Sequence, residues 1–337
     1  MKTIHKILLV LAVLVLSCGY MVYDAVAIAP KRYTIRYENL SSDLIPKQMD
    51  DISILFFSDL EYGTFMNQER LERLVAAVNS VSPDIVIFGG DVFDETVPVS
   101  DEGTATVTEY FSLIKAPLGK FAVFGDNDKR SEQMAETVSS IMYDSDFEML
   151  VNRSVLLRNT GSQSITLVGL DNGLNGQPNA ETAYANVSSE SYVITVCHTP
   201  DTVSAVPGDL TDYFLAGHSH GGQAYFFFTA DYTPEKASDY LRGKHSINGN
   251  FILDITNGTG TTGRDVRFLS DAEVVLYRLH HTGADAEAPA VTEEPSDEAE
   301  PAAEVTEENT SAEEETEDES AEVSEDTVTE EESAEEQ

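Results

Sequence analysis

Short apolar runs that end in an aspartate or a histidine recur along this chain, and they limit the folds open to it. Apolar runs of about four to eight residues are typical of strands buried on both faces, as in parallel sheets. The sequence predicts such strands at residues 52–57, 84–88, 121–124, 192–197 and 213–216, with further strands at 32–38, 155–158, 165–168, 223–228, 251–255 and 274–279. No internal repeat is present.

Helical patterns alternate with the first of these runs. Leu71, Leu74, Val75 and Val78 follow helical spacing after Asn67, which is a favourable residue for a helix start. Residues 107–114 and 131–142 are also predicted to be helical. Strands that alternate with helices predict an α/β fold with a largely parallel sheet.

Polar side chains follow five of the predicted strands. Ligands of open α/β sheets bind at the carboxyl ends of strands, so these residues are expected to converge. They are Asp59 and Glu61, then Asp91, then Asp126 and Asp128, then His198, then His218 and His220. Each alone also fits a plain turn or helix start. Carboxylates and imidazoles together are metal ligands, and the turn Gly217-His218-Ser219-His220-Gly221 carries two of the imidazoles.

The charge is concentrated at the C-terminus. The formal net charge is −40, and residues 285–337 contain 24 acidic residues with no Lys or Arg. This tail, assigned as 284–337, is predicted to be disordered because it cannot bury enough apolar surface to offset its chain entropy. The rest of the chain is also acidic, so no nucleic-acid partner is expected.

The N-terminus is predicted to be a signal or membrane anchor, over residues 1–28. Lys2 and Lys6 precede a 16-residue apolar run at 7–22. A cleaved signal, a bacterial lipoprotein signal ending at Cys18 and an uncleaved anchor all stay open. In each case the body is expected on the extracytoplasmic side of a membrane. Cys18 and Cys197 are not expected to form a disulfide.

Residues 32–279 resemble the calcineurin-like metallophosphoesterases, and among them a membrane-associated branch with lipid-sugar pyrophosphohydrolase-like proteins. The family motifs D-x-H, G-D, G-N-H-D/E, H and G-H-x-H are matched in order. Here they read Asp59-Leu60-Glu61, Gly90-Asp91, Gly125-Asp126-Asn127-Asp128, His198 and Gly217-His218-Ser219-His220. The resemblance implies a four-layer α/β/β/α sandwich over residues 29–283, with two divalent metal ions at the sheet edge.

The resemblance also implies a role for each matched residue. The first ion would take Asp59, Glu61, Asp91 and His220, and the second would take Asp91, Asp126, His198 and His218. Asp91 would bridge the two ions. Asn127 occupies the position of the family's catalytic histidine, and Asp128 would support it.

Three of these positions depart from the family pattern. Glu61 replaces a histidine ligand, Asp126 replaces an asparagine ligand, and Asn127 replaces the catalytic histidine. The first two changes make the site richer in oxygen, which favours Mn, Mg or Fe over Zn. The third removes a titratable group near the leaving oxygen.

Two functions remain open from the sequence. The first is a membrane-held, metal-dependent hydrolase of phosphodiesters or pyrophosphates, acting on a small molecule or a lipid-linked substrate. The second is a pseudoenzyme or metal-containing binding module that keeps the fold without turnover. The loops at 95–106, 171–184 and 229–248, which would set the substrate, carry no readable motif, and nothing indicates an oligomeric state.

Overall fold

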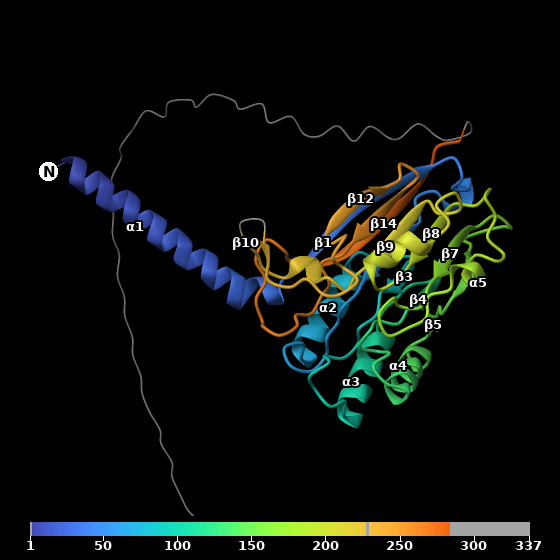
Figure 1. Cartoon of the computed structure of the whole chain (residues 1–337), viewed down its shortest axis with the longest axis horizontal. Coiled ribbons are helices and arrows are strands. Elements are labelled where there is room, and N and C mark those ends of the chain that lie inside the picture. Colours follow the sequence, from blue (N-terminus) through green and yellow to red (C-terminus); the bar gives the residue numbers. More distant parts are fainter. Residues whose placement is uncertain (1, 227–228, 284–337) are drawn as a thin grey trace, which may run out of the picture. The chain divides into compact units, whose positions relative to one another are not determined.

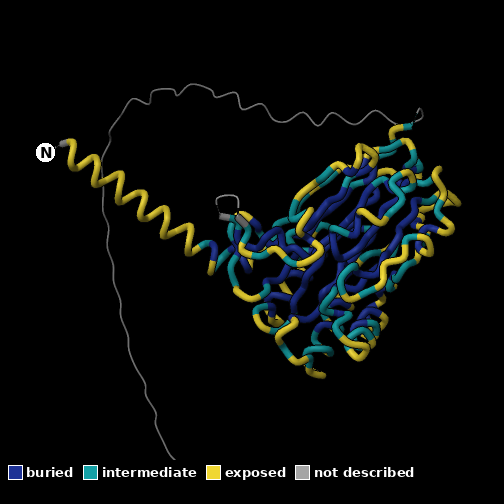
Figure 2. Tube along the Cα trace, viewed as in Figure 1, coloured by how far each residue is buried: buried dark blue, intermediate teal, exposed yellow. Residues whose placement is uncertain are grey.

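The computed structural model describes residues 2–226 and 229–283, so the predicted acidic tail lies outside the described residues. The chain starts with α1 (Lys2–Tyr23), which continues through a π-helical turn, η1 (Asp24–Ile28), and a 3-10 turn, η2 (Ala29–Lys31). The segment from Thr3 to Lys31 is long and apolar enough to cross a membrane. Its α1 part is exposed along its length, in contrast to the buried centre of the body (Figures 1 and 2).

Two six-stranded sheets form the centre of the fold. The first has the order β1-β14-β2-β3-β4-β5 and the second the order β12-β13-β9-β8-β7-β6. The strands of the first sheet are β1 (Tyr33–Ser42), β2 (Ser53–Phe57), β3 (Ile85–Phe88), β4 (Gly119–Ala122), β5 (Phe147–Met149) and β14 (Ala272–His281). Those of the second are β6 (Arg153–Leu157), β7 (Ile165–Gly169), β8 (Val193–Val196), β9 (Tyr213–Ala216), β12 (Gly243–Ile247) and β13 (Phe251–Ile255).

The strand directions place several carboxyl ends at one edge of each sheet. In the first sheet β2, β3, β4 and β5 run parallel, while β14 runs antiparallel to β2 and parallel to β1. In the second sheet β7, β8, β9 and β13 run parallel, and the edge strands β6 and β12 are antiparallel to their neighbours. Both sheets therefore offer a row of parallel strand ends for a site.

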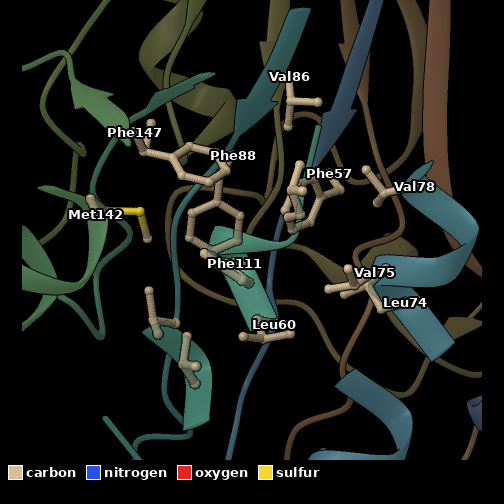
Figure 3. Packing of buried hydrophobic residues seen from close by; sticks show 14 of the residues in the cluster. Phe57, Leu60, Leu74, Val75, Val78, Val86, Phe88, Phe111, Met142 and Phe147 are labelled. Atoms are coloured by element: carbon tan, nitrogen blue, oxygen red, sulfur yellow. The ribbon is translucent and has the colours of Figure 1, made fainter. Parts of the chain in front are cut away.

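Three apolar clusters separate four layers. The first packs α2 (Gln68–Ser80), α3 (Asp101–Ser112) and α4 (Glu132–Asp144) against the outer face of the first sheet, around Phe57, Phe88 and Phe111 (Figure 3). The second fills the space between the sheets. The third covers the outer face of the second sheet with α5 (Ala180–Ala183) and the 3-10 turn η4 (Pro200–Ala205). The α/β/β/α order is confirmed, with a thin fourth layer.

Most predicted elements are present, and the errors have local causes. Asn67 caps α2 through its side chain, as predicted. The helix predicted at 107–114 begins earlier because the Ser100 side chain caps it through the Gly103 amide. The strand predicted at 223–228 is wrong in its bounds. After the histidine turn comes a 3-10 turn, η5 (His220–Gly222), and the short β10 (Tyr225–Phe226), paired with β11 (Thr229–Ala230), while residues 227–228 are outside the described residues.

Candidate metal centre

The predicted site residues come together where the parallel strands of both sheets end. Two groups of ligand atoms form there, and within each group the atoms lie within 4.8 Å of one another. One group contains Asp91, Asp126, His198 and His218, and the other contains Asp59, Glu61 and His220. These are the seven residues that the sequence analysis selected. Each group combines side chains that follow strands of the first sheet with side chains that follow strands of the second.

The larger group is compact. His198 Nε2 lies 3.1 Å from both Asp91 Oδ2 and Asp126 Oδ1, and His218 Nδ1 lies 2.8 Å from Asp126 Oδ1. In the smaller group, His220 Nε2 lies 3.7 Å from Asp59 Oδ1 and 3.7 Å from Glu61 Oε1. His198 Nε2 is also 3.8 Å from Asp59 Oδ1, which makes the two groups neighbours.

The backbone at the site is held in an unfavourable conformation. Asp59, Glu61, Asp91, His218 and His220 all have a positive φ, between 50° and 69°. A residue other than glycine in the left-handed region costs about 1–3 kcal/mol, and such strain gathers at functional sites. Five strained residues among seven indicate that the fold is organised to aim these side chains.

Hydrogen bonds outside the groups fix which ring nitrogen faces inward. His198 donates from Nδ1 to the Gly89 carbonyl at 2.7 Å, and His218 donates from Nε2 to the Glu235 carbonyl at 2.7 Å. In a neutral ring the inward nitrogen is then a bare acceptor. Second hydrogen bonds of this kind orient the histidine ligands of metal ions.

Inside the site, the hydrogen-bond acceptors of the histidines and the carboxylates therefore face one another. His198 Nε2, Asp126 Oδ1 and Asp59 Oδ2 are buried and lack a hydrogen-bond partner of good geometry among the described residues. A buried polar atom without a partner costs about 1–3 kcal/mol, and more when charged. A cation shared by these atoms would satisfy all of them, so the donor set fits divalent metal ions.

The pKa shifts of the site residues also indicate that this site favours bound positive charge. Burial, with the nearby Asp91 and Asp59 carboxylates, raises the pKa of Glu61 well above its usual range. Burial also raises the pKa of Asp91 to about 7. Burial disfavours a charged His198, but Asp91 and Asp126 outweigh it and raise the pKa of the ring. Without an ion the site must hold protons that a metal would displace.

Asn127 lies between the two groups. Its Nδ2 is 3.2 Å from Glu61 Oε1 and 3.3 Å from Asp91 Oδ2, and its backbone amide donates to Asp91 Oδ1 at 2.9 Å. The Asn127 side chain thus contacts a carboxylate of each ligand group.

Asp128 ties the loop after β3 to the loop after β4. Its carboxylate is buried and accepts hydrogen bonds from the amides of Asp91, Val92 and Gly125, at 2.8, 2.9 and 2.8 Å. These bonds set the position of Asp91 relative to the loop that carries Asp126.

Several residues around the site were not selected from the sequence. Asn172, which follows β7, donates to the Gly125 carbonyl at 3.0 Å, and Asn175 donates to the Asp126 carbonyl at 3.0 Å. Asn172 ends a parallel strand as the predicted residues do, so the same rule could have found it. The Tyr232 ring contacts the His220 ring edge-on, with centroids 5.5 Å apart. Tyr232 belongs to a loop without a motif and offered no such signal.

Arg267 is a buried residue that holds the loop behind Asp59, which belongs to the smaller group. Within the described part of the chain its guanidinium has no carboxylate partner, and it donates to the carbonyls of Ser270, Asn257 and Gly260 at 2.9, 2.8 and 2.5 Å. Burial lowers its pKa to about 10, so it stays charged at neutral pH. The Gly260 amide in turn donates to the Asp59 carbonyl at 2.6 Å. Arg267 therefore holds the loop that backs Asp59.

Replacing Arg267 by methionine is expected to destabilise the fold. Methionine fills similar space but leaves at least three buried carbonyls without a donor, and each costs about 1–3 kcal/mol. We expect the free energy of unfolding to fall by about 3 kcal/mol or more, measured by urea denaturation in detergent. Arg264→Met is the matched control, since that side chain is 72% exposed. An equal stability of the two variants would contradict this role.

Comparisons with known proteins agree with the site. A family model described as calcineurin-like phosphoesterase matches residues 52–222. The uncharacterized metallophosphoesterase YkuE of Bacillus subtilis is 27% identical over 244 residues, covering 72% of this chain and 84% of YkuE. A transmembrane protein with metallophosphoesterase domain of Danio rerio is 22% identical over 276 residues, covering 77% of this chain and 60% of that protein.

A crystal structure of calcineurin-like phosphoesterase YfkN from Bacillus subtilis has a TM-score of 0.36 and 13% sequence identity to this chain, with 60% of this chain and 80% of that chain covered. The matched family model spans half of the chain and contains all seven residues of the two ligand groups, from Asp59 to His220. The chain belongs to the calcineurin-like phosphoesterase family.

Proposed function

We propose that this protein is a membrane-held, metal-dependent phosphoesterase that hydrolyses phosphodiester or pyrophosphate bonds at an altered two-metal site. The observation that carries the proposal is the set of buried acceptors that face one another around His198 Nε2, Asp126 Oδ1 and Asp59 Oδ2. Family membership supports the reaction class. We assign residues 29–283 to the catalytic domain and residues 1–28 to the anchor.

We assign the ligands as two overlapping sets. Asp59, Glu61 and His220 would hold the first ion, Asp126, His198 and His218 would hold the second, and Asp91 would bridge them. Two divalent ions held there would polarise a phosphoryl group and lower the pKa of a water molecule. The left-handed backbone at five of these residues keeps the ligands aimed before any ion arrives.

The ligand set also favours certain metals. Four carboxylates, Asp59, Glu61, Asp91 and Asp126, balance the charge of two divalent cations. Oxygen-rich sites suit Mn and Mg, while nitrogen and sulfur ligands suit Zn. We therefore favour Mn, Mg or Fe over Zn. A fully balanced site also attracts a phosphate anion less strongly than a positively charged one.

Asn127 sets the range of substrates. Its amide can donate a hydrogen bond to a phosphoryl oxygen, but it cannot supply a proton to the leaving oxygen. Substrates whose leaving group is stable as an anion need that proton least. Aryl phosphodiesters and nucleoside diphosphate linkages are expected to react fastest for this reason.

A second function, a metal-containing binding module without turnover, is favoured by the same residue. The Asn127 amide contacts both Glu61 and Asp91, so it ties together the two groups that a substrate must approach. In this alternative the site binds ions and a phosphorylated ligand and does not cleave it.

The test is hydrolysis of bis(4-nitrophenyl) phosphate by the full chain in detergent with added Mn²⁺. We expect release of nitrophenolate that stops on chelation and returns with Mn²⁺, and that is absent in His198→Ala. Binding of Mn²⁺ without any release would favour the binding module.

The membrane anchor makes a separate prediction. Lys2 and Lys6 precede the apolar part of α1, and basic residues stay on the cytoplasmic side. We propose that the body faces outward, and that protease added to intact cells degrades it while a cytosolic marker survives. Protection of the body until the cells are lysed would contradict this orientation.

A further inference from the structure

An apolar groove lies between the end of the N-terminal helix and the loop after the site. It has a volume of about 350 Å³ and is lined by Met21, Val22 and Val26 on one side and by Val266 and Phe268 on the other. Among the described residues, none that lines it is charged. Ligand pockets have volumes of about 300–1,000 Å³, so this groove has room for part of a lipid chain.

An exposed leucine, Leu269, directly follows the groove residue Phe268 in the chain. Leu269 is 65% exposed and has a φ of 53°, in the left-handed region. Such a backbone is unusual for a bulky side chain, and an exposed leucine forgoes the free energy that its burial would contribute. At the end of the helix, the groove residue Val26 is 46% exposed and Tyr23 is 57% exposed. Leu269 is thus an exposed apolar residue on a strained backbone.

Charged residues of both signs neighbour this surface, and one basic residue is hydrogen-bonded directly to Leu269. Arg242 donates to the Leu269 carbonyl at 2.8 Å, and Arg32 pairs with Asp24 and Asp271. Lys31 is exposed at the end of the helical segment, and the Arg264 side chain, which is 72% exposed, lies 3.6 Å from Asp231. Apolar residues with Lys and Arg beside them are typical of surfaces that rest in the headgroup region of a bilayer.

The position of the groove along α1 indicates what fills it. At 1.5 Å per residue, the 22 residues of α1 span about 33 Å, close to the thickness of a bilayer core. The groove is lined by the last turns of α1 and by η1, which follows α1 directly. When α1 spans a membrane, the groove lies at the boundary of that membrane.

One segment connects this surface with the site. The Arg267 amide donates to the Ala25 carbonyl at 2.9 Å, between the two groove residues Val266 and Phe268. The Arg267 side chain reaches the Gly260 carbonyl, and the Gly260 amide bonds the Asp59 carbonyl. The anchor, the groove and the smaller ligand group are therefore parts of one hydrogen-bonded unit.

We propose that this face is a bilayer-docking surface, in which the groove holds an acyl chain of a membrane lipid and Leu269 inserts beside it. A consequence, which rests on the proposed function, is that the site acts on phosphoesters carried by lipid headgroups. The docking is testable without any turnover.

The chain has no tryptophan, which allows single-tryptophan probes of the surface. Leu269→Trp, Leu156→Trp and Leu11→Trp are each reconstituted as full chains in phosphatidylcholine vesicles with or without bromine on the acyl chains. We expect bromine to quench the fluorescence of Leu269→Trp as strongly as that of Leu11→Trp, whose probe lies in α1. Leu156→Trp, which replaces a leucine that is 50% exposed on β6, should not be quenched. Unquenched fluorescence of Leu269→Trp beside quenched fluorescence of Leu11→Trp would overturn the docking surface.

The groove is tested in the Leu269→Trp background. Val266→Asp places a charge in the groove and should abolish most of the quenching, while Val266→Thr, of nearly the same shape, should keep most of it. Quenching that survives Val266→Asp would show that α1 alone brings the tryptophan probe to the lipid, and the acyl-chain site would be rejected. Circular dichroism of each variant shows whether it is folded.

Substrate choice is tested last, with Leu269→Glu against Leu156→Glu. Leu269→Glu removes an apolar contact with the bilayer and places a charge there, which should weaken binding to the vesicle about tenfold or more. We expect Leu269→Glu to slow hydrolysis of a nitrophenyl phosphodiester attached to a vesicle lipid about tenfold, and to leave bis(4-nitrophenyl) phosphate unaffected. Equal rates on the lipid substrate would overturn the lipid preference. No hydrolysis of either substrate by the unaltered chain would instead reject the proposed function, and the quenching result would still decide the docking.

Discussion

Replacing Asp91 by alanine is expected to remove both metal ions from the full chain. Asp91 Oδ2 lies 3.1 Å from His198 Nε2 in the larger group. Asn127 Nδ2 donates both to Asp91 and to Glu61, which belongs to the smaller group. The Asp91 side chain thus serves both groups. Even partners outside the ligand shell cost about 10–100-fold when removed, so we expect a loss of activity of at least about 100-fold.

Metal analysis of the purified variants checks this expectation. His220→Ala should lose mainly the first ion, because His220 contacts only Asp59 and Glu61 among the ligand residues. Asp209→Ala removes an exposed carboxylate and should keep both ions. Retention of two ions by Asp91→Ala would show that Asp91 does not bridge them, and a different ligand assignment would then be needed.

Replacing Asn127 by histidine is expected to raise activity most on substrates with poor leaving groups. Such groups need a proton in the transition state, and general acid catalysis contributes about 10²–10⁴-fold. The position is suitable because Asn127 Nδ2 already lies 3.2–3.3 Å from Glu61 and Asp91. An imidazole there can protonate a leaving oxygen that the amide can only hydrogen-bond.

The measurement compares kcat on alkyl and aryl phosphodiesters for Asn127→His, alone and with Asp126→Asn. Asn186→His, at an exposed position outside the site, is the matched control. The gain should be larger for the alkyl substrate and should disappear above the pKa of the new histidine, since the acid is then deprotonated. No gain on any substrate, with both ions still bound, would favour the binding module without turnover.

The sequence was sufficient to predict which residues meet at the strand ends, because the carboxyl ends of parallel strands lie at one edge of a sheet. Once residues 52–57 and 84–88 are recognised as buried parallel strands, Asp59 and Asp91 must lie near each other. The two sheets could not be placed from strand patterns alone. The pairing of β1 with β14 joins residues more than 200 positions apart, and no local pattern encodes it.

The supporting residues were harder to predict because their partners are backbone atoms. The sequence does not show that the partners of Arg267 are buried backbone carbonyls. The strained backbone at Glu61 and His218 is equally hidden, because tertiary contacts impose it against local preference. The groove beside α1 forms only when residues 18–26 meet residues 266–268.

The metal content of the unaltered full chain tests the central claim most directly. The two ligand groups predict two ions per chain when the detergent-solubilised protein is loaded with Mn²⁺, dialysed and measured by mass spectrometry for metals. The same preparation should cleave bis(4-nitrophenyl) phosphate until the ions are chelated. A chain that stays folded yet retains less than one ion, or an activity that chelation leaves unchanged, would contradict the two-metal site.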